Sequence, residues 1–240
     1  MVTKKPKPYP DLVSEVGLGF FISEPDQKTI IGVDEVGRGC LAGSVVAAAA
    51  ILSPERVLKM GFLKSGKRGK AFSKSPSKDD HPIRRLQDSK MISEEHRPMF
   101  RDAVKAFAKG YAIGEASVEE IGELNILYAS HLAMERAVLK LEKKLGIKAD
   151  CILVDGNIVP KVFKDRGKPL VKGDQKSLTI ACASIIAKVH RDQMMDDLDA
   201  QYPGYGLKTH KGYPTPFHKQ KIIELGATPL HRKGFKGSGV

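Results

Sequence analysis

The sequence predicts an α/β fold built as one main domain. Three short apolar runs have the length and composition of buried strands: residues 29–36, 44–52 and 149–154. Other segments have the length and spacing of helices: residues 93–109, 125–145 and 178–202. A chain of 240 residues is long enough to bury one full core.

The composition indicates the kind of partner and the compartment. A formal net charge of +12 favours a polyanionic partner. The three cysteines are odd in number and widely spaced, which argues against a disulfide framework or a zinc site and fits a reducing, cytoplasmic environment. The longest apolar run, residues 45–52, is too short to cross a bilayer, so we expect no membrane partner.

Two segments of the first third are predicted to be flexible. Residues 1–26 are rich in lysine and proline near their start and read as a basic arm. The first two strands should form a hairpin around the loop at 37–43. Residues 61–82 then have the composition of a flexible basic insertion. This insertion either helps to hold nucleic acid or is a tolerated surface loop.

The middle of the chain alternates between helix and strand. Pro98 fits badly inside a helix over residues 93–109, so we expect this helix to start later than Ser93. Residues 111–117 predict a third strand. Ser117 and Glu120 have the spacing of a capping box, which predicts a short helix that Gly122 should end.

A longer helix is predicted to follow over residues 125–145, and its apolar stripe is typical of a core face. The strand at 149–154 then delivers Asp155 at its carboxyl end, where α/β proteins place their active sites. We expect a catalytic domain over residues 27–202. A helical C-terminal segment should occupy residues 203–240, with a short helix near 216–225.

Four acids stand at points where strands end or helices begin: Asp34, Glu35, Asp155 and Asp174. Grouped carboxylates repel one another unless a cation neutralises them, and oxygen ligands suit Mg²⁺ or Mn²⁺ rather than zinc. The glycine loop after Glu35 lets backbone approach a ligand closely, and Arg38 suits phosphate. On these residues alone, a strand that ends in an ordinary solvated turn remains the alternative.

Seven short sequence motifs occur along the chain. They are Gly32–Gly39 (GVDEVGRG), Asp88–Lys90 (DSK), Glu123–Leu127 (ELNIL), Val154–Asn157 (VDGN), Val171–Asp174 (VKGD), Ala183–Asp192 (ASIIAKVHRD) and His210–Thr215 (HKGYPT). Through these motifs the chain closely resembles bacterial ribonuclease HII, the type 2 ribonuclease H family. The resemblance covers residues 29 to 235. It implies a ribonuclease H-like mixed sheet flanked by helices, with a helical C-terminal part closing over the substrate.

The resemblance also implies a role for each motif. The metal-binding and catalytic acids would be Asp34, Glu35, Asp155 and Asp174. Substrate-binding residues would be Gly37, Arg38 and Gly39 at the ribose 2′-hydroxyl, Ser89 and Lys90 near a phosphate, and Tyr213 against the sugar at the RNA–DNA junction. Asp192 lies in a matching motif without being one of the four acids, so we expect a structural or supporting role for it.

The implied activity is that of an endonuclease using two Mn²⁺ or Mg²⁺ ions. It would hydrolyse the RNA strand of RNA–DNA hybrids. It would also cut 5′ of single ribonucleotides in duplex DNA, as in ribonucleotide excision repair, leaving 3′-hydroxyl and 5′-phosphate ends. We expect a monomer whose substrates are RNA–DNA hybrids and ribonucleotide-containing duplex DNA.

Three features depart from the family pattern: Cys40 replaces a usual proline, Met91-Ile92 replaces a usual Lys-Leu, and the basic segment at 61–82 is longer. Two other functions compete with this interpretation. A metal-free ribonuclease would use paired histidines such as His210 and His218, and a non-catalytic RNA-binding module would need only the basic charge. Neither accounts for four acids at the ends of strands and helices.

Overall fold

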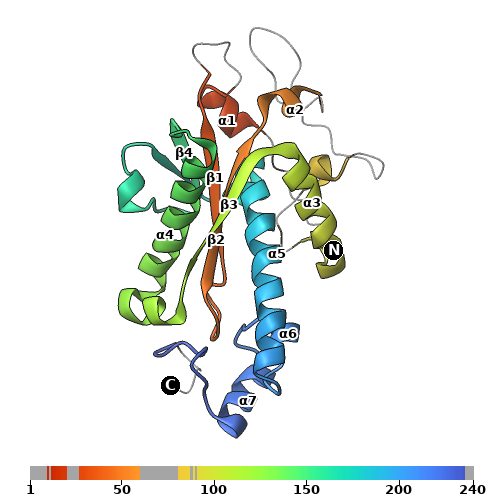
Figure 1. Ribbon diagram of the computed structural model, residues 1–240, viewed down its shortest axis with the longest axis vertical. Helices are drawn as coiled ribbons and strands as arrows, with labels where there is room; N and C mark the ends of the chain where they lie inside the picture. The colour runs from red at the N-terminus through yellow and green to blue at the C-terminus, as the bar shows by residue number, and fades with distance from the viewer. Residues whose placement is uncertain are drawn as a thin grey trace, which may run out of the picture.

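The computed structural model describes residues 10, 12–20, 27–59, 81–86, 89 and 91–235. In this part of the chain a five-stranded sheet lies between two layers of helices (Figure 1). The order of its strands is β3 (Ala108–Ala116), β2 (Val45–Leu52), β1 (Ile30–Val36), β4 (Cys151–Asp155) and β5 (Gly167–Leu170). The pairs β1–β2 and β2–β3 are antiparallel, whereas β1–β4 and β4–β5 are parallel. The predicted hairpin and the mixed sheet are confirmed.

Each face of the sheet is covered by its own helices. Helix α4 (Val118–Leu145) packs on one face, and α3 (Arg97–Phe107) and α5 (Leu178–Gln201) pack on the other (Figure 1). Strand β2 is buried along its whole length, and its successive side chains join the two cores alternately. Its alanines are small enough to let helices approach both faces closely.

The other elements are short. They are α1 (Val13–Gly17), α2 (Pro54–Lys59), α6 (Leu207–His210), α7 (Pro216–Leu225), and the 3₁₀ turns η1 (Pro82–Arg85), η2 (Glu94–His96), η3 (Lys161–Phe163) and η4 (Gly173–Gln175). Helix α3 starts at Arg97, with Pro98 in its first turn, as the sequence predicted. In the part of the chain that is described, no helix is both long and apolar enough to cross a membrane.

Helix α4 differs from the prediction of two separate helices. The capping box is present, because Ser117 Oγ accepts from the Glu120 N–H and Glu120 Oε2 accepts from the Ser117 N–H. Gly122, however, does not end the helix. The irregularity lies at Asn125, whose φ of 65° and ψ of 165° kink the helix. Asn125 Oδ1 accepts from the Leu127 N–H and so caps the second half locally, which is why asparagine suits this position.

The N-terminal range also differs from the predicted flexible arm where it is described. Residues 12–20 contain α1, and the side chains of Leu12 and Phe20 are buried in the core under α5. A short amphipathic segment that finds a core in the folded protein has no long periodicity to reveal it. Residues 1–9, 11 and 21–26 of the predicted arm, and the basic insertion up to residue 80, lie outside the described residues.

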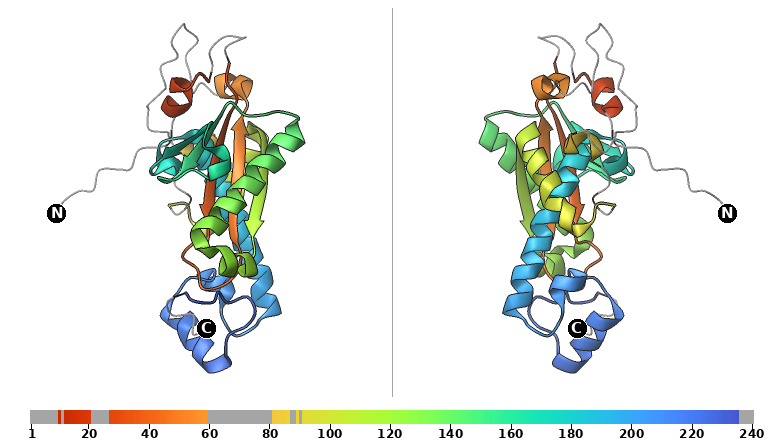
Figure 2. Two further views of the ribbon diagram at one scale, coloured as in Figure 1. Left: turned by 90° about the vertical axis from the view of Figure 1, so that its left-hand side faces the viewer. Right: turned by 90° about the vertical axis from the view of Figure 1, so that its right-hand side faces the viewer.

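The C-terminal segment packs against the end of the sheet where β1 finishes, as Figures 1 and 2 show. Leu41 and Ala42, in the loop after β1, share a small core with Leu207, Ile222 and Leu230. Helix α7 has the bounds that the sequence predicted. This packing brings the segment around Tyr213 to the same end of the sheet as Asp34.

Candidate active site

Three of the four predicted acids lie near one another because two parallel strands end side by side. Val33 of β1 pairs with Val154 of β4, so Asp34 and Asp155 follow at the same edge of the sheet. The backbone N–H of Gly173 donates to Asp155 Oδ1 at 2.6 Å. This bond holds turn η4, and with it Asp174, beside the end of β4.

The electrostatics show that these carboxyl groups influence one another. Burial raises the pKa of Asp34 well above its usual range, and the negative charges of Glu35, Asp155 and Asp174 raise it further. The pKa of Glu35 is raised as well, mainly by burial, although Arg38 at 3.3 Å opposes the rise. Asp34 and Glu35 are therefore acids whose ionised forms are unfavourable until a positive charge joins them.

The donor set fits a hard divalent cation, since every candidate ligand is a carboxylate oxygen. Among the described residues, no three His, Cys, Asp or Glu side chains converge closely enough to form a metal site as they stand. Neighbouring acids with unneutralised charges would be expected to keep their oxygens apart. The arrangement is a set of adjacent acids and not a preformed coordination sphere.

The glycine loop at residues 37–43 is bound on its interior side by a buried arginine. The Arg232 guanidinium donates from Nη1 to the carbonyls of Gly37, Arg38 and Cys40, at 2.7, 3.1 and 3.0 Å. Its Nε donates to the carbonyl of Gly43 at 2.8 Å. Burial lowers the pKa of Arg232 to about 10, so the side chain stays charged at neutral pH. One side chain thus binds four carbonyls of the loop.

A second buried arginine joins this loop to the C-terminal segment. Arg191 of α5 donates from Nη1 to the carbonyl of Lys211 at 2.7 Å. Nearby, the Leu41 N–H donates to the carbonyl of Gly212 at 2.8 Å. Tyr213 follows directly, with 37% of its surface exposed. The predicted loop and the predicted tyrosine therefore lie on neighbouring segments.

The backbone of Tyr213 is held by a chain of neutral histidines. The Thr228 N–H donates to Nδ1 of His231, so the proton of this ring lies on Nε2. That Nε2–H faces the Nε2 of His218 at 3.3 Å, and the Nδ1–H of His218 donates to the Tyr213 carbonyl at 3.0 Å. Burial lowers the pKa of His218 to about 4.

These contacts disfavour the metal-free alternative. His218 is fully buried, and both of its ring nitrogens have partners within the protein. His210 stacks on His218 with ring centroids 4.2 Å apart. It accepts from the Gly212 N–H and donates to the Tyr205 carbonyl. The ring nitrogens of both histidines therefore bond within the protein and are not placed to exchange protons with a substrate.

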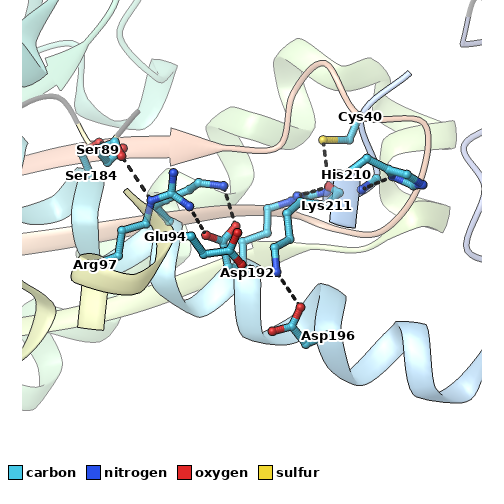
Figure 3. A network of polar contacts seen from close by, with 12 residues as sticks. Cys40, Ser89, Glu94, Arg97, Ser184, Asp192, Asp196, His210 and Lys211 are labelled. Atoms are coloured by element: carbon cyan, nitrogen blue, oxygen red, sulfur yellow. Dashed lines mark hydrogen bonds and ion pairs between the residues drawn. The ribbon is translucent and has the colours of Figure 1, made fainter. Parts of the chain in front are cut away.

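Ser89 contacts a neighbour of Asp34 and not Asp34 itself. Its Oγ is 3.1 Å from Ser184 Oγ (Figure 3). Ser184 in turn hydrogen-bonds to Asp34. Ser89 is buried, so its side chain reaches the site through Ser184. Asp88 and Lys90, its neighbours in the motif, lie outside the described residues.

Asp192 has the supporting environment that the sequence predicted. Its carboxylate pairs with Lys188 on the same helix and with Arg97 at 2.9 Å (Figure 3). One turn further along α5, Asp196 pairs with Lys211. Asp192 and Asp196 both bind protein cations, so they tie α3 and the C-terminal segment to the helix.

Several supporting residues were missed by sequence reasoning. Ser184 and Arg191 lie inside a motif that had been recognised, so the motif was the available signal. Arg232 and His231 lie in the basic tail, where no periodicity or spacing distinguishes them from solvated residues.

Comparison with known families identifies the chain. The sequence profile of the family described as Ribonuclease HII matches residues 31–68 and 76–238. The chain belongs to the ribonuclease HII family. It is therefore a metal-dependent endonuclease of the ribonuclease H class, which acts on RNA–DNA hybrids.

Solved structures support the fold. Ribonuclease H2 from Pyrococcus horikoshii OT3 matches with a TM-score of 0.63 and 24% identity over 88% of this chain and 95% of that one. Ribonuclease HII from Archaeoglobus fulgidus, solved in complex with PCNA, matches with a TM-score of 0.61 and 20% identity over 86% and 95%. Bst-RNase HIII, solved with Mn²⁺, matches with a TM-score of 0.60 and 18% identity over 88% and 69%. The predicted ribonuclease H-like fold is confirmed; the assignment to bacteria stays a prediction.

Two glycines of the loop should respond differently to alanine. Gly37 has a φ of +93°, and a Cβ there would lie 2.2 Å from Nε of Arg191. We expect Gly37→Ala to lower the free energy of unfolding by about 1–3 kcal/mol. Gly39 has a permissive φ and open space around a Cβ, so Gly39→Ala should fold normally.

If the surface of the loop at Gly39 meets the substrate, Gly39→Ala should nevertheless slow the cleavage of an RNA–DNA hybrid. Thermal unfolding and hybrid cleavage, measured on both variants, separate the two effects. Wild-type cleavage by Gly39→Ala would show that this face of the loop does not approach the substrate.

Proposed function

We propose that this ribonuclease HII cuts 5′ of a single ribonucleotide embedded in duplex DNA, as well as within RNA–DNA hybrids, and leaves 3′-hydroxyl and 5′-phosphate ends. The observation that carries the proposal is the proximity of Asp34, Asp155 and Asp174 to a loop that is bonded to Gly212, the residue before Tyr213. The acids supply a place for chemistry at a phosphate. The loop and the tyrosine supply a means of recognising the ribonucleotide next to which the strand is cut.

The acids would hold two divalent ions, Mg²⁺ or Mn²⁺. Asp34, Glu35, Asp155 and Asp174 are the proposed ligands, and they offer the oxygen atoms that these ions prefer. When bound, such a pair of ions activates a water and stabilises the leaving oxygen of an in-line displacement at phosphorus. Ser184 orients Asp34, and Gly173 orients Asp155. No side chain of the protein needs to act as a nucleophile.

The loop is suited to recognising one ribose. The carbonyls of Gly37, Arg38 and Cys40 are turned toward Arg232 inside the protein, which keeps the backbone rigid. The Arg38 side chain remains half-exposed and can meet a phosphate. Backbone groups at Gly37 and Gly39 can approach a single 2′-hydroxyl closely. A site that hydrogen-bonds a hydroxyl discriminates strongly against a sugar that lacks it.

Tyr213 supplies the second part of the recognition. Its ring would pack against the deoxyribose after the ribonucleotide, where a 2′-hydroxyl would crowd it. The hydrogen bond from the Leu41 N–H to the Gly212 carbonyl keeps the backbone next to Tyr213 beside the glycine loop. The glycine loop and the Tyr213 ring together would recognise one RNA-to-DNA junction. Such a junction is present wherever a ribonucleotide has been misincorporated into DNA. The proposal includes a role in ribonucleotide excision repair. It also includes a cytoplasmic location and a monomeric state.

The test compares substrates and metals. Duplexes that contain one, four or many ribonucleotides are incubated with Mg²⁺, Mn²⁺ or EDTA, and the cut sites and end groups are mapped. We expect incision 5′ of the single ribonucleotide with either metal and no cleavage in EDTA. An enzyme that cuts long hybrids but ignores the single ribonucleotide with both metals would contradict the proposed specificity.

A further inference from the structure

Helix α1 lies ahead of the part of the chain that matches the family, which begins at residue 31. It is nevertheless an integral part of the fold. Leu12 and Phe20 are buried in the same core as Leu178 and Ile180 of α5. The N-terminal segment therefore packs against the start of the helix that follows Asp174.

One side chain of α1 reaches the first turn of α5. Glu15 is completely buried, and its Oε1 accepts three hydrogen bonds. The donors are Ser177 Oγ at 2.6 Å, Thr179 Oγ1 at 2.6 Å and the backbone N–H of Thr179 at 2.9 Å. Ser177 in turn caps α5, because its Oγ accepts from the Ile180 N–H. Glu15 thus satisfies donors at a helix N-terminus, where a carboxylate is favoured.

This carboxyl group has no other role within the described structure. Its Oε2 is buried and has no hydrogen-bond partner among the described residues. Burial raises the pKa of Glu15, although hydrogen bonds from Ser177 and Thr179 oppose the rise. A buried acid with one unpaired oxygen is costly, so the bonds that it makes to α5 must offset that cost.

The first turn of α5 is connected directly to the acids of the active site. The Ser177 N–H donates to the carbonyl of Gly173 at 2.8 Å, which closes the turn that carries Asp174. The Gly173 N–H bonds to Asp155. On the other side, a Cβ at Gly32 would lie 2.5 Å from the Thr179 carbonyl carbon, so α5 is in contact with β1 just before Asp34. A shift of this turn would move Asp174 relative to the other acids.

We propose that Glu15 is a positioning residue for the active site: it anchors the first turn of α5 and so holds Asp174 in register with Asp34 and Asp155. The proposal rests on the proposed metal-binding role of these acids. It assigns a function to an N-terminal segment that lies outside the family match. Glu15 touches neither the substrate nor the acids and acts only through Ser177 and Thr179.

The test measures metal binding and cleavage in full-length Glu15→Ala, Glu15→Gln and Leu12→Ala. Glu15→Ala leaves three buried donors without an acceptor, whereas the amide oxygen of Glu15→Gln can accept the same bonds. Leu12→Ala is the matched control, because it loosens α1 by a cavity and keeps the carboxyl group. Mn²⁺ binding is followed directly by the electron paramagnetic resonance of the free ion. Cleavage of a hybrid is measured over a series of Mn²⁺ concentrations, at a temperature where each variant is folded.

We expect Glu15→Ala to need about tenfold more Mn²⁺ for half-saturation in both measurements, the size of effect usual for residues that orient metal ligands. Glu15→Gln should bind Mn²⁺ nearly as the wild type does. Leu12→Ala should lose thermal stability while its Mn²⁺ titration stays unchanged. If Glu15→Ala does not fold, Thr179→Val replaces it in the comparison, because valine removes one donor and keeps the carboxyl group buried.

Two results would overturn the proposal in distinguishable ways. A wild-type protein that neither binds Mn²⁺ nor cuts the hybrid would refute the proposed function itself. A wild type that does both, with Glu15→Ala or its replacement Thr179→Val titrating Mn²⁺ as the wild type does, would refute only the role of Glu15. An equal shift in Leu12→Ala would also refute it, because the effect would then come from loosening α1.

Discussion

Asp34→Asn should abolish most cleavage while leaving the protein folded and more stable than the wild type in metal-free buffer. Residues that merely orient metal ligands typically contribute about 10- to 100-fold, so loss of a ligand should cost more than about 100-fold in turnover. The gain in stability follows from the raised pKa of Asp34. Such a group adds stability at low pH and loses it as the pH rises through its folded pKa, so at neutral pH the buried carboxyl group lowers stability, and asparagine removes this cost.

The same experiment extends to Asp155→Asn and Asp174→Asn, which should also cut turnover severely. Asp192→Asn is the matched control, since Asp192 is a buried acid that already pairs with Lys188 and Arg97. Leaving these cations unpaired should cost about 3–5 kcal/mol of stability, yet reduce the turnover of folded molecules only mildly. Thermal unfolding with and without Mg²⁺, together with cleavage rates, measures both effects. A dead Asp192→Asn beside a nearly normal Asp174→Asn would show that the fourth acid is wrongly assigned.

Tyr213→Ala should lose far more activity on a duplex with one ribonucleotide than on a long hybrid. Aromatic contacts with nucleic acids are worth about 1–3 kcal/mol, which corresponds to roughly 5- to 150-fold in rate. In a long hybrid most cleavage positions are followed by another ribose and not by a deoxyribose. Cleavage there should therefore depend less on contact between the Tyr213 ring and a deoxyribose. The measurement is kcat/KM on both substrates.

Two variants control for other causes. Tyr213→Phe keeps the ring and should retain most activity on both substrates. Tyr111→Ala removes a half-buried tyrosine from β3 that lies beside Lys105 and Lys144, and it should affect both substrates equally. If Tyr213→Ala slows both substrates by the same factor, then Tyr213 serves to pack the segment between α6 and α7 and does not read the junction.

The sequence by itself was sufficient to predict most of the long helices and strands. Apolar runs of strand length predicted β1, β2 and β4, because a strand buried on both faces needs few polar residues. The capping box at Ser117 and the glycine at Gly146 marked both ends of α4, since these signals act within a few residues of the chain. Its middle was mispredicted, because Gly122 is a permissive residue in a helix and not an obligatory stop.

The four acids were also proposed from the sequence, as members of motifs at strand and helix ends, and their role stays a prediction. What the sequence alone could not decide is how these positions are held. Arg232 binds carbonyls of a loop 195 positions earlier in the chain, and Glu15 caps a turn 162 positions later. No local pattern encodes such pairs, because their geometry exists only once the sheet and its helices have packed. Local propensities therefore determined the elements and the reactive groups, whereas long-range burial decided which polar residues position them.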